Sequence, residues 1–305
     1  MLVTLKEILE QANHEGYAVP APNVSTELDA RAALEVGEEL NSPMVLDVGF
    51  RVNPDIVFFG GYLTRLADKA KVPVAVHLDH GANYKEFEQC ILAIRAGFTS
   101  IMVDRSTLPF EENVRQVAEL TRVAHAVGVS VEAELGHVGS GKAYDSAEKM
   151  YTDPALAKEF IERTGVDCLA VAIGNAHGSY KGVPELDFAR LTEIKRLTGD
   201  FPLVLHGSSG IAEADLSKAC RLGINKVNVS QELLRGASRE ILNADLEGNG
   251  VYKLWALARK GYKDVLAHFI RNCYGSRDKA WTPARQGLGE VAVMVLEEES
   301  SPLYV

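Results

Sequence analysis

Short runs of apolar, often β-branched residues alternate along the chain with longer segments whose apolar residues recur at helical spacing. Eight of the short runs are predicted to be strands: Tyr17–Pro22, Met44–Val48, Val74–Leu78, Ser100–Val103, Val129–Leu135, Asp167–Ile173, Leu203–Leu205 and Lys226–Val229. The segments between them have apolar residues at helical spacing, for example Leu28–Leu40, Val114–Ala126 and Leu216–Leu222. Strands that alternate with helices in this way indicate βαβ units and a parallel sheet.

The number of units and the chain length favour an α/β fold of the closed (β/α)8 TIM-barrel type. A chain of 305 residues accommodates eight such units in one domain. An open doubly wound sheet is the alternative, but its usual early G-x-G-x-x-G turn is absent. We expect a barrel over residues 1–275 with an extra N-terminal helix near Met1–Gln11 and a helical extension at Tyr252–Asn272. A tail over 276–305 then packs on the barrel or on a neighbouring subunit.

Polar side chains follow almost every predicted strand. In chain order they are Asn23, Asp47, Asp79 with His80, Asp104, Glu134, Asn175 with His177, His206 and Asn228. The carboxyl ends of barrel strands converge on one mouth, so these residues are candidates for a common site. Asp47 and Asp104, taken singly, are better explained as ordinary polar residues of solvated loops.

Three of these residues, His80, His177 and His206, indicate a metal site. Three neutral imidazoles that leave one coordination position open are typical of catalytic zinc. Chance is a weak explanation, because the chain has only eight histidines. Others, such as His14, His125 and His268, lie in helical patterns and are expected at the surface or in packing.

Composition excludes some functions. A net charge of −10 argues against a nucleic-acid partner. No apolar run approaches membrane-spanning length, and the N-terminal segment lacks the apolar core of a signal peptide. The four cysteines form no CxxC pair, a pattern that suits a reducing cytoplasm. We therefore expect a cytoplasmic protein without a membrane partner.

Five ordered sequence motifs lie at predicted strand ends. They are HLDHG at His77–Gly81, VEAELG at Val131–Gly136, GNAHG at Gly174–Gly178, HGSSG at His206–Gly210 and NVS at Asn228–Ser230. With them the chain resembles the class II, metal-dependent ketose-bisphosphate aldolases, in particular the fructose- and tagatose-bisphosphate branch, over roughly residues 1–275. The resemblance implies zinc or another divalent metal. It also implies reversible cleavage of a phosphorylated ketose to dihydroxyacetone phosphate and an aldehyde, by a homodimer or homotetramer.

The resemblance assigns roles to individual residues. His80, His177 and His206 correspond to the metal ligands. Glu134 corresponds to a residue near the metal that holds an alternative ion position, or is a buried carboxylate that orients the ligands. Asp79 corresponds to the acid/base for the C4 hydroxyl, a group the chemistry needs because cleavage removes that proton. His77 is expected to be a packed, hydrogen-bonded histidine of the barrel.

A phosphate has to be bound without a strongly basic patch. Glycine-rich turns offer backbone N–H groups, and a helix that begins after the turn adds a favourable dipole. The HGSSG turn fits, and the residues expected to contact substrate or phosphate are Gly178, Gly207, Ser209, Asn228 and Ser230. Family members also place a monovalent cation near this site.

The chain departs from the family where the far end of the substrate should bind. Gly49 replaces the usual Ser or Thr after the second strand, and EGNGVYKLW lacks the usual arginine. We therefore expect altered specificity at a distal end near Asn23, Gly49 and Arg51, with Arg51 able to supply the missing cation.

Two further departures concern the loop after VEAELG and the phosphate-binding strand. The loop reads GHVGSGKAYDSAEKM, with Gly141 and Lys142 where acidic residues are usual. Asp145, Glu148 or His137 are the candidates to replace the usual proton carrier there. Gln231 stands in place of the usual Thr after the Asn-Val pair.

Three other functions are alternatives. One is a classical fructose- or tagatose-1,6-bisphosphate aldolase, in which the far-phosphate contacts are merely rearranged. Another is a non-catalytic barrel subunit of an aldolase complex, although a scaffold has no need of metal ligands. The last is a zinc hydrolase, but these usually begin with an HxH on the first strand, and Tyr17–Asn23 contains no histidine.

Overall fold

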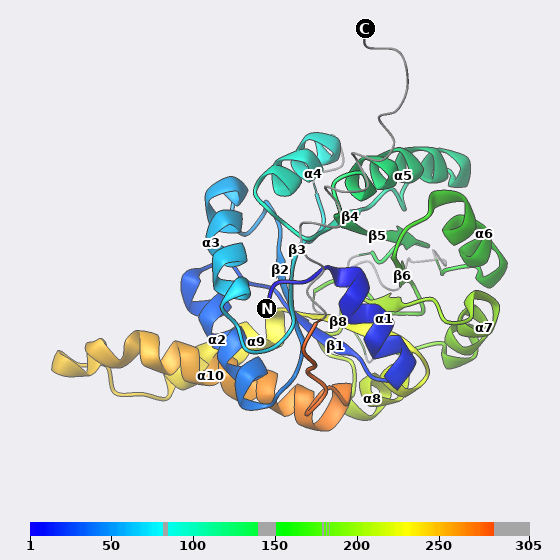
Figure 1. Ribbon diagram of the computed structural model, residues 1–305. Helices are drawn as coiled ribbons and strands as arrows, with labels where there is room; N and C mark the ends of the chain where they lie inside the picture. Colours follow the sequence, from blue (N-terminus) through cyan, green and yellow to red (C-terminus); the bar gives the residue numbers. More distant parts are fainter. Residues whose placement is uncertain (82–84, 140–150, 179, 181, 183, 284–305) are drawn as a thin grey trace, which may run out of the picture.

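The computed structural model describes residues 1–81, 85–139, 151–178, 180, 182 and 184–283. Eight parallel strands form one sheet in the order β1-β8-β7-β6-β5-β4-β3-β2. The two ends of this order meet at a bridge between Asn23 and Asp47 and at a hydrogen bond of 2.8 Å from Val24 N to Asp47 O. The sheet therefore closes on itself as a (β/α)8 barrel, as the alternation predicts (Figure 1).

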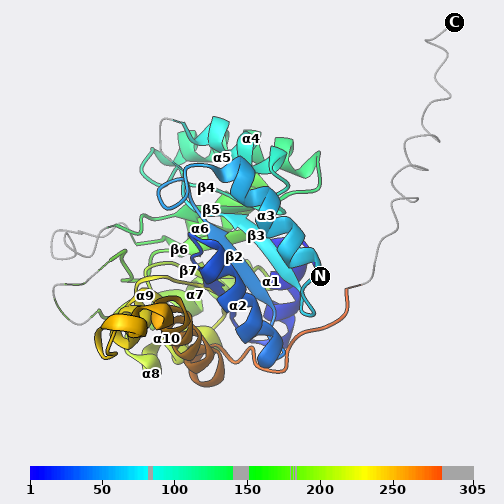
Figure 2. The ribbon, with the colours of Figure 1, turned by 90° about the vertical axis from the view of Figure 1, so that its left-hand side faces the viewer.

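The strands are β1 (Val19–Pro22), β2 (Met44–Val48), β3 (Val74–Leu78), β4 (Ser100–Val103), β5 (Ser130–Leu135), β6 (Cys168–Val171), β7 (Leu203–Leu205) and β8 (Ile224–Val229). The helices are α1 (Leu5–Glu15), α2 (Glu27–Glu39), α3 (Ile56–Asp68), α4 (Glu86–Arg95), α5 (Phe110–His125), α6 (Pro154–Thr164), α7 (Phe188–Thr198), α8 (Glu213–Arg221), α9 (Gln231–Leu242) and α10 (Leu254–Phe269). Figure 2 shows α2 and α3 on the outside of β2 and β3.

All eight predicted strands are present, four of them with the predicted bounds. The expected helix Tyr252–Asn272 is divided into a 3₁₀ turn, Gly248–Lys253, then α10, then a π-helical turn, Ile270–Tyr274. Helix α9 was not among the predicted helices. The predicted tail lies mostly outside the described residues, and the division at residue 275 stays a prediction.

Successive side chains along each strand point to opposite faces of the sheet, and the two sets form two separate hydrophobic clusters. Residues such as Val131 and Val227 face outward and pack under the surrounding helices. The opposite positions, for example Val45, Ala75 and Met102, belong to a second buried cluster inside the barrel. Side chains two positions farther along a strand point the same way, so the inward set continues toward the carboxyl ends.

Helix α1 closes the amino-terminal opening of the barrel. It begins with a capping box between Thr4 and Glu7, and its apolar face, with Leu5, Ile8 and Leu9, joins the inner cluster. Figure 1 shows α1 lying across the opening nearest the viewer. The other opening, at the carboxyl ends of the strands, is left for the polar residues. Among the described residues, no helix combines the length and apolarity needed to cross a membrane.

Helices α9 and α10 lie side by side and extend beyond the ring of helices as a two-helix arm (Figure 1, Figure 2). They approach so closely that a Cβ placed on Gly261 would lie 2.2 Å from the backbone oxygen of Gly236. Only glycine leaves room for this contact, because a backbone atom cannot move aside as a side chain can.

The approach predicts that Gly261→Val destabilises the protein. Overpacking of this kind costs about 1–3 kcal/mol, because the two helices have to separate. Thermal and urea unfolding would measure the loss. Gly61→Ala is the matched control, because a Cβ there meets nothing within 4 Å. Wild-type stability of Gly261→Val would mean that the helices do not pack at this distance.

Candidate active site

A cavity of about 210 Å³ opens at the carboxyl ends of the strands. It is lined by Asn23, Asp79, His177, Gly178, Gly207, Ser208, Ser209, Asn228, Ser230 and Gln231. These residues come from the ends of five strands, β1, β3, β6, β7 and β8, and the connections that follow them, which the barrel brings to one mouth.

Four ligand-type side chains gather at this cavity: His80, Glu134, His177 and His206. One nitrogen or oxygen atom of each lies within 4.8 Å of the others. Nε2 of His80 lies 3.1 Å from Nδ1 of His206, and the rings of His80 and His177 meet edge to face at 5.0 Å between centroids. The three predicted histidines and the predicted carboxylate are therefore brought together.

The donor atoms of this cluster fit a divalent metal. Nε2 of His177 and Oε2 of Glu134 are buried, and neither has a hydrogen-bond partner among the described residues. Burying such polar atoms without a partner is costly, and a bound cation would satisfy both. Imidazole nitrogens with a carboxylate oxygen are ligands that zinc and related metals accept.

The orientation of His80 is fixed by Asp104. Nδ1 of His80 lies 3.0 Å from Oδ2 of Asp104, so Nε2 faces the cluster. Burial opposes protonation of His80, but the hydrogen bond to Asp104 and the charges of Asp79 and Glu134 outweigh it and raise its pKa to about 10. The surroundings of Nε2 thus favour a positive charge, which a proton or a metal ion can provide.

The orientation of His206 is fixed by Glu132. Nε2 of His206 donates to Oε1 of Glu132 at 2.7 Å, which leaves Nδ1 facing His80 and the cluster. Burial lowers the pKa of His177 to about 3, and the charge of His80 acts in the same direction. His177 is therefore neutral, the state in which an imidazole can donate electrons to a metal.

Asp79 lies beside the histidine cluster and is held by two amides. Nδ2 of Asn23 donates to Oδ2 at 3.0 Å, and Nδ2 of Asn228 donates to Oδ1 at 3.3 Å. Burial opposes ionisation of Asp79, but neighbouring positive charge, first that of His80 and also that of Lys226, lowers its pKa well below the usual value. Asp79 is an ionised carboxylate that faces the cavity and can accept a proton.

One end of the cavity consists of backbone turns and hydroxyl groups. Gly207 has φ +64°, and a Cβ there would lie 2.2 Å from the oxygen of Ala176, so the two turns touch. Ser209 follows in the turn before α8, and Ser230 is the N-cap residue of α9 without a side-chain cap. No lysine or arginine is among the described residues that line the cavity. An anion here would be bound by neutral donors and helix starts.

The three residues predicted at the distal end of the substrate differ in their position relative to the cavity. Asn23 lines the cavity, whereas Arg51 is exposed in the turn that follows β2 and is not among the lining residues. Gly49 is buried next to the backbone of Asp79 and His80.

Of the three candidates for the missing proton carrier, one lies within the described residues. His137 is partly exposed, with Nδ1 2.9 Å from Oγ of Ser106 and 3.5 Å from Glu134. The other candidates, Asp145 and Glu148, lie outside the described residues, as do Gly141 and Lys142.

Interpreting Asp47 and Asp104 as ordinary loop residues was wrong. Asp47 is fully buried inside the barrel, and Asp104 contacts a predicted metal ligand. A single residue near a strand end does not reveal its orientation in the sequence, because whether its side chain points inward depends on the register of the strand.

The sequence analysis also missed Glu132 and Lys226, which are fully buried in the barrel interior. Their signal was present: charged residues inside runs predicted to be core strands require partners. Tyr180 was missed as well. Its hydroxyl accepts from Ala176 N at 2.7 Å and donates to Gly207 O at 2.9 Å, which joins the His177 and His206 loops.

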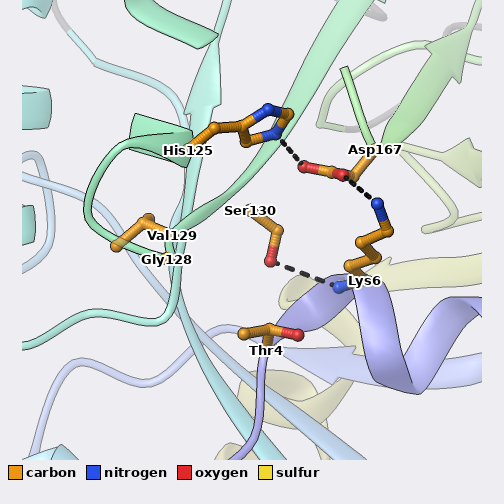
Figure 3. A pocket seen from close by; sticks show the side chains of 7 residues that line it. All are labelled: Thr4, Lys6, His125, Gly128, Val129, Ser130 and Asp167. Atoms are coloured by element: carbon orange, nitrogen blue, oxygen red, sulfur yellow. Dashed lines mark hydrogen bonds and ion pairs between the residues drawn. The ribbon is translucent and has the colours of Figure 1, made fainter. Parts of the chain in front are cut away.

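A second cavity, of about 170 Å³, lies at the opposite end of the barrel beside α1. Figure 3 shows its polar groups pairing with one another: Asp167 accepts from His125 at 2.8 Å and lies 3.4 Å from Lys6. Ser130 accepts from the backbone of Lys6 at 3.2 Å. These contacts attach α1 to the barrel and leave no unpaired group for a ligand among the side chains drawn.

Comparison with known proteins agrees with this geometry. The family model described as "Fructose-bisphosphate aldolase class-II" matches residues 3–279. A "Probable fructose-bisphosphate aldolase" of Bacillus subtilis (strain 168) is 42% identical over 291 residues, covering 92% of this chain and 99% of that protein. A fructose-bisphosphate aldolase of Geobacillus stearothermophilus is 41% identical over 293 residues, with the same coverage. The crystal structure of the YdjI aldolase from Escherichia coli K12 matches with a TM-score of 0.81 at 35% identity, covering 92% of this chain and 100% of that one.

The cluster predicts about one divalent metal ion per chain. Replacing His206 by alanine removes one imidazole and leaves Glu132 without its partner, so His206→Ala should lose most of the metal. Elemental analysis of the purified proteins measures this, with His268→Ala, half-exposed on α10, as the control. Equal metal content in His206→Ala and wild type would exclude His206 as a ligand.

Proposed function

Since the chain belongs to the class II fructose-bisphosphate aldolase family and is thus an aldolase, a carbon–carbon lyase, we propose that it cleaves a phosphorylated ketose reversibly to dihydroxyacetone phosphate and an aldehyde. The observation that carries the proposal is the position of an ionised Asp79 beside the cluster of His80, His177 and His206. A non-catalytic subunit would gain nothing from this arrangement.

Asp79 takes the proton in the cleavage step. As the carbon–carbon bond breaks, the C4 hydroxyl loses its proton to the Asp79 carboxylate and its carbon becomes the aldehyde. The bonding electrons pass to the carbon next to the ketone, which then needs a proton of its own. The hydrogen bonds from Asn23 and Asn228 hold the Asp79 carboxylate in a fixed orientation throughout.

His80, His177 and His206 are the residues proposed to hold zinc or another divalent metal. When bound, such an ion polarises the ketone and stabilises the negative charge that develops on its oxygen. Glu134 offers a further oxygen to the same group of atoms, and its other oxygen accepts from Val138 N at 2.8 Å.

The phosphate of the dihydroxyacetone phosphate half is proposed to bind at Gly178, Gly207, Ser209 and Ser230. These residues supply backbone N–H groups and hydroxyls: Gly178 follows β6, Gly207 and Ser209 lie in the turn that leads to α8, and Ser230 is the N-cap of α9, where the helix dipole favours an anion. Asn228, whose Oδ1 is buried without a partner among the described residues, is placed to contact the substrate beside Asp79.

At its far end the substrate is proposed to lack a second phosphate or to carry a different group. Gly49 has no hydroxyl, and the cavity lining offers no arginine there. The alternative is a classical fructose- or tagatose-1,6-bisphosphate aldolase, which the names of the relatives favour. In that case Arg51 supplies the missing positive charge.

The protein is also proposed to act in the cytoplasm as a homodimer or homotetramer. Support for the compartment comes from the four cysteines, which are all free and buried. Support for the oligomer comes from the resemblance to the family.

A panel of ketose mono- and bisphosphates, assayed for release of dihydroxyacetone phosphate by the metal-loaded protein, tests the proposed function. Release from at least one substrate is expected, together with its loss after treatment with a chelator and recovery on adding Zn²⁺. A metal-loaded, folded protein that releases it from none of them would overturn the proposal.

Asp79→Ala should keep the metal and the fold but lose most of the turnover. General acid/base catalysis contributes about a hundredfold to ten-thousandfold, so kcat should fall by this amount. Asp264→Ala, which removes an exposed carboxylate on α10, serves as the control. Turnover of Asp79→Ala within a few fold of wild type would exclude Asp79 as the proton acceptor.

Matched mono- and bisphosphate substrates test the far end. We expect kcat/KM for fructose or tagatose bisphosphate to be lower than for a ketose monophosphate, because charge-assisted hydrogen bonds worth about 1.5–3 kcal/mol each are missing. Gly49→Ser should raise the ratio of kcat/KM for the bisphosphate to kcat/KM for the monophosphate about tenfold. The added Cβ fits, since its nearest neighbour would be 3.5 Å away. A bisphosphate preference in wild type that vanishes in Arg51→Ala would instead support the classical activity.

A further inference from the structure

We propose that Lys226, which lies inside the barrel and touches neither substrate nor metal, is a positioning residue that holds the metal ligand His206 in place through Glu132. The inference rests on the metal site of the proposed function. It concerns why that site has a fixed geometry.

Lys226 and Glu132 come from strands that are not neighbours. Lys226 is on β8 and Glu132 on β5, with β7 and β6 between them in the sheet. Nζ of Lys226 reaches across the interior and donates to Oε2 of Glu132 at 2.9 Å. Both side chains are fully buried, so the contact is shielded from bulk solvent.

The carboxylate of Glu132 has one strong donor on each oxygen, and the thiol of Cys168 is a weaker donor to Oε2, at 3.7 Å. Oε1 accepts from Nε2 of His206, and Oε2 accepts from Lys226. Rotation of the carboxylate would break one bond or the other. Lys226 therefore fixes the carboxylate plane, and through it the ring of His206. With its N–H at Nε2, His206 presents the lone pair of Nδ1 to the cluster.

No other charged side chain described in the interior can replace Lys226. His77 lies 3.6 Å from Oε2 of Glu132, but its pKa is lowered to about 3, first by burial and then by the charge of Lys226, so it is neutral. Asp47 lies 3.6 Å from Lys226 and adds only another carboxyl group. Without Lys226, Glu132 would keep His206 as its one strong donor.

The affinity for Zn²⁺ shows whether Lys226 positions His206 or only stabilises the fold. The wild-type and variant proteins would be loaded with Zn²⁺ and titrated against a chromogenic chelator to give the dissociation constant. Lys226→Met should raise it about 10- to 100-fold, the usual effect of losing an outer partner of a metal ligand. Lys195→Met is the matched control: this lysine is also largely buried, but it bonds Phe201 O at 2.8 Å and Asn13, away from the site. Its Zn²⁺ affinity should not change.

A second variant guards against loss of folding in the first. Lys226→Met combined with Glu132→Gln removes both charges and keeps an amide oxygen that can accept from His206, but the amide then lacks the ammonium group that fixed the carboxylate. It should fold and still bind Zn²⁺ more weakly than wild type.

The outcomes separate the two proposals. A folded variant lacking Lys226 that binds Zn²⁺ within about threefold of wild type would overturn the positioning role. Failure of both variants to fold would also overturn it, because Lys226 would then serve the fold alone. If the wild type itself bound no Zn²⁺, the metal site would be wrong rather than this inference.

Discussion

The interior of a closed eight-stranded barrel has just enough room for side chains and no access for water, so each polar group that points inward has to find its partner there. At the α1 end this constraint is met with apolar residues such as Val45, Ala75 and Val204. Charged and polar groups also point into the interior, among them Glu132, His77 and Lys226. Glu132, His77 and Lys226 pair across the barrel rather than along it, and the residues of the candidate site lie directly above them.

As a result, the imidazoles of His80 and His206 are hydrogen-bonded to carboxylates on the side that faces away from the cluster. Glu132 is the partner of His206, and Asp104 is the partner of His80. Asp104 is itself fixed, because its backbone N–H donates to Glu86, a buried carboxylate that also pairs with Arg105. His80 and His206 are thus each oriented by a carboxylate, and a buried cation lies beyond that carboxylate or its neighbour. Such a chain of contacts keeps donor atoms at one point even when no ion is there to gather them.

Sequence patterns were sufficient for the barrel and for the residues at its mouth, because both depend on local periodicity. Strand runs such as Met44–Val48 and Val74–Leu78 have the predicted bounds, and the three histidines meet as their positions after strands require. What lies beneath the mouth depends on pairing across the barrel, between residues such as Lys226 and Glu132 that are far apart in sequence. No local pattern encodes which inward residues share a level. For the same reason Asp47 resembled a loop residue although it is buried.

The closure of the barrel also has a consequence for how the chain acquires its structure. Strand β1 has β8 as its ladder partner, and Asn225 donates to the oxygen of Tyr17, 208 positions earlier in the chain. The first strand and α1 therefore have no complete binding surface until nearly the whole barrel has been synthesised. Pairings between such distant segments close large loops, which slows folding. The apolar face of α1 stays without its final partners for most of translation, when it is a candidate for chaperone binding.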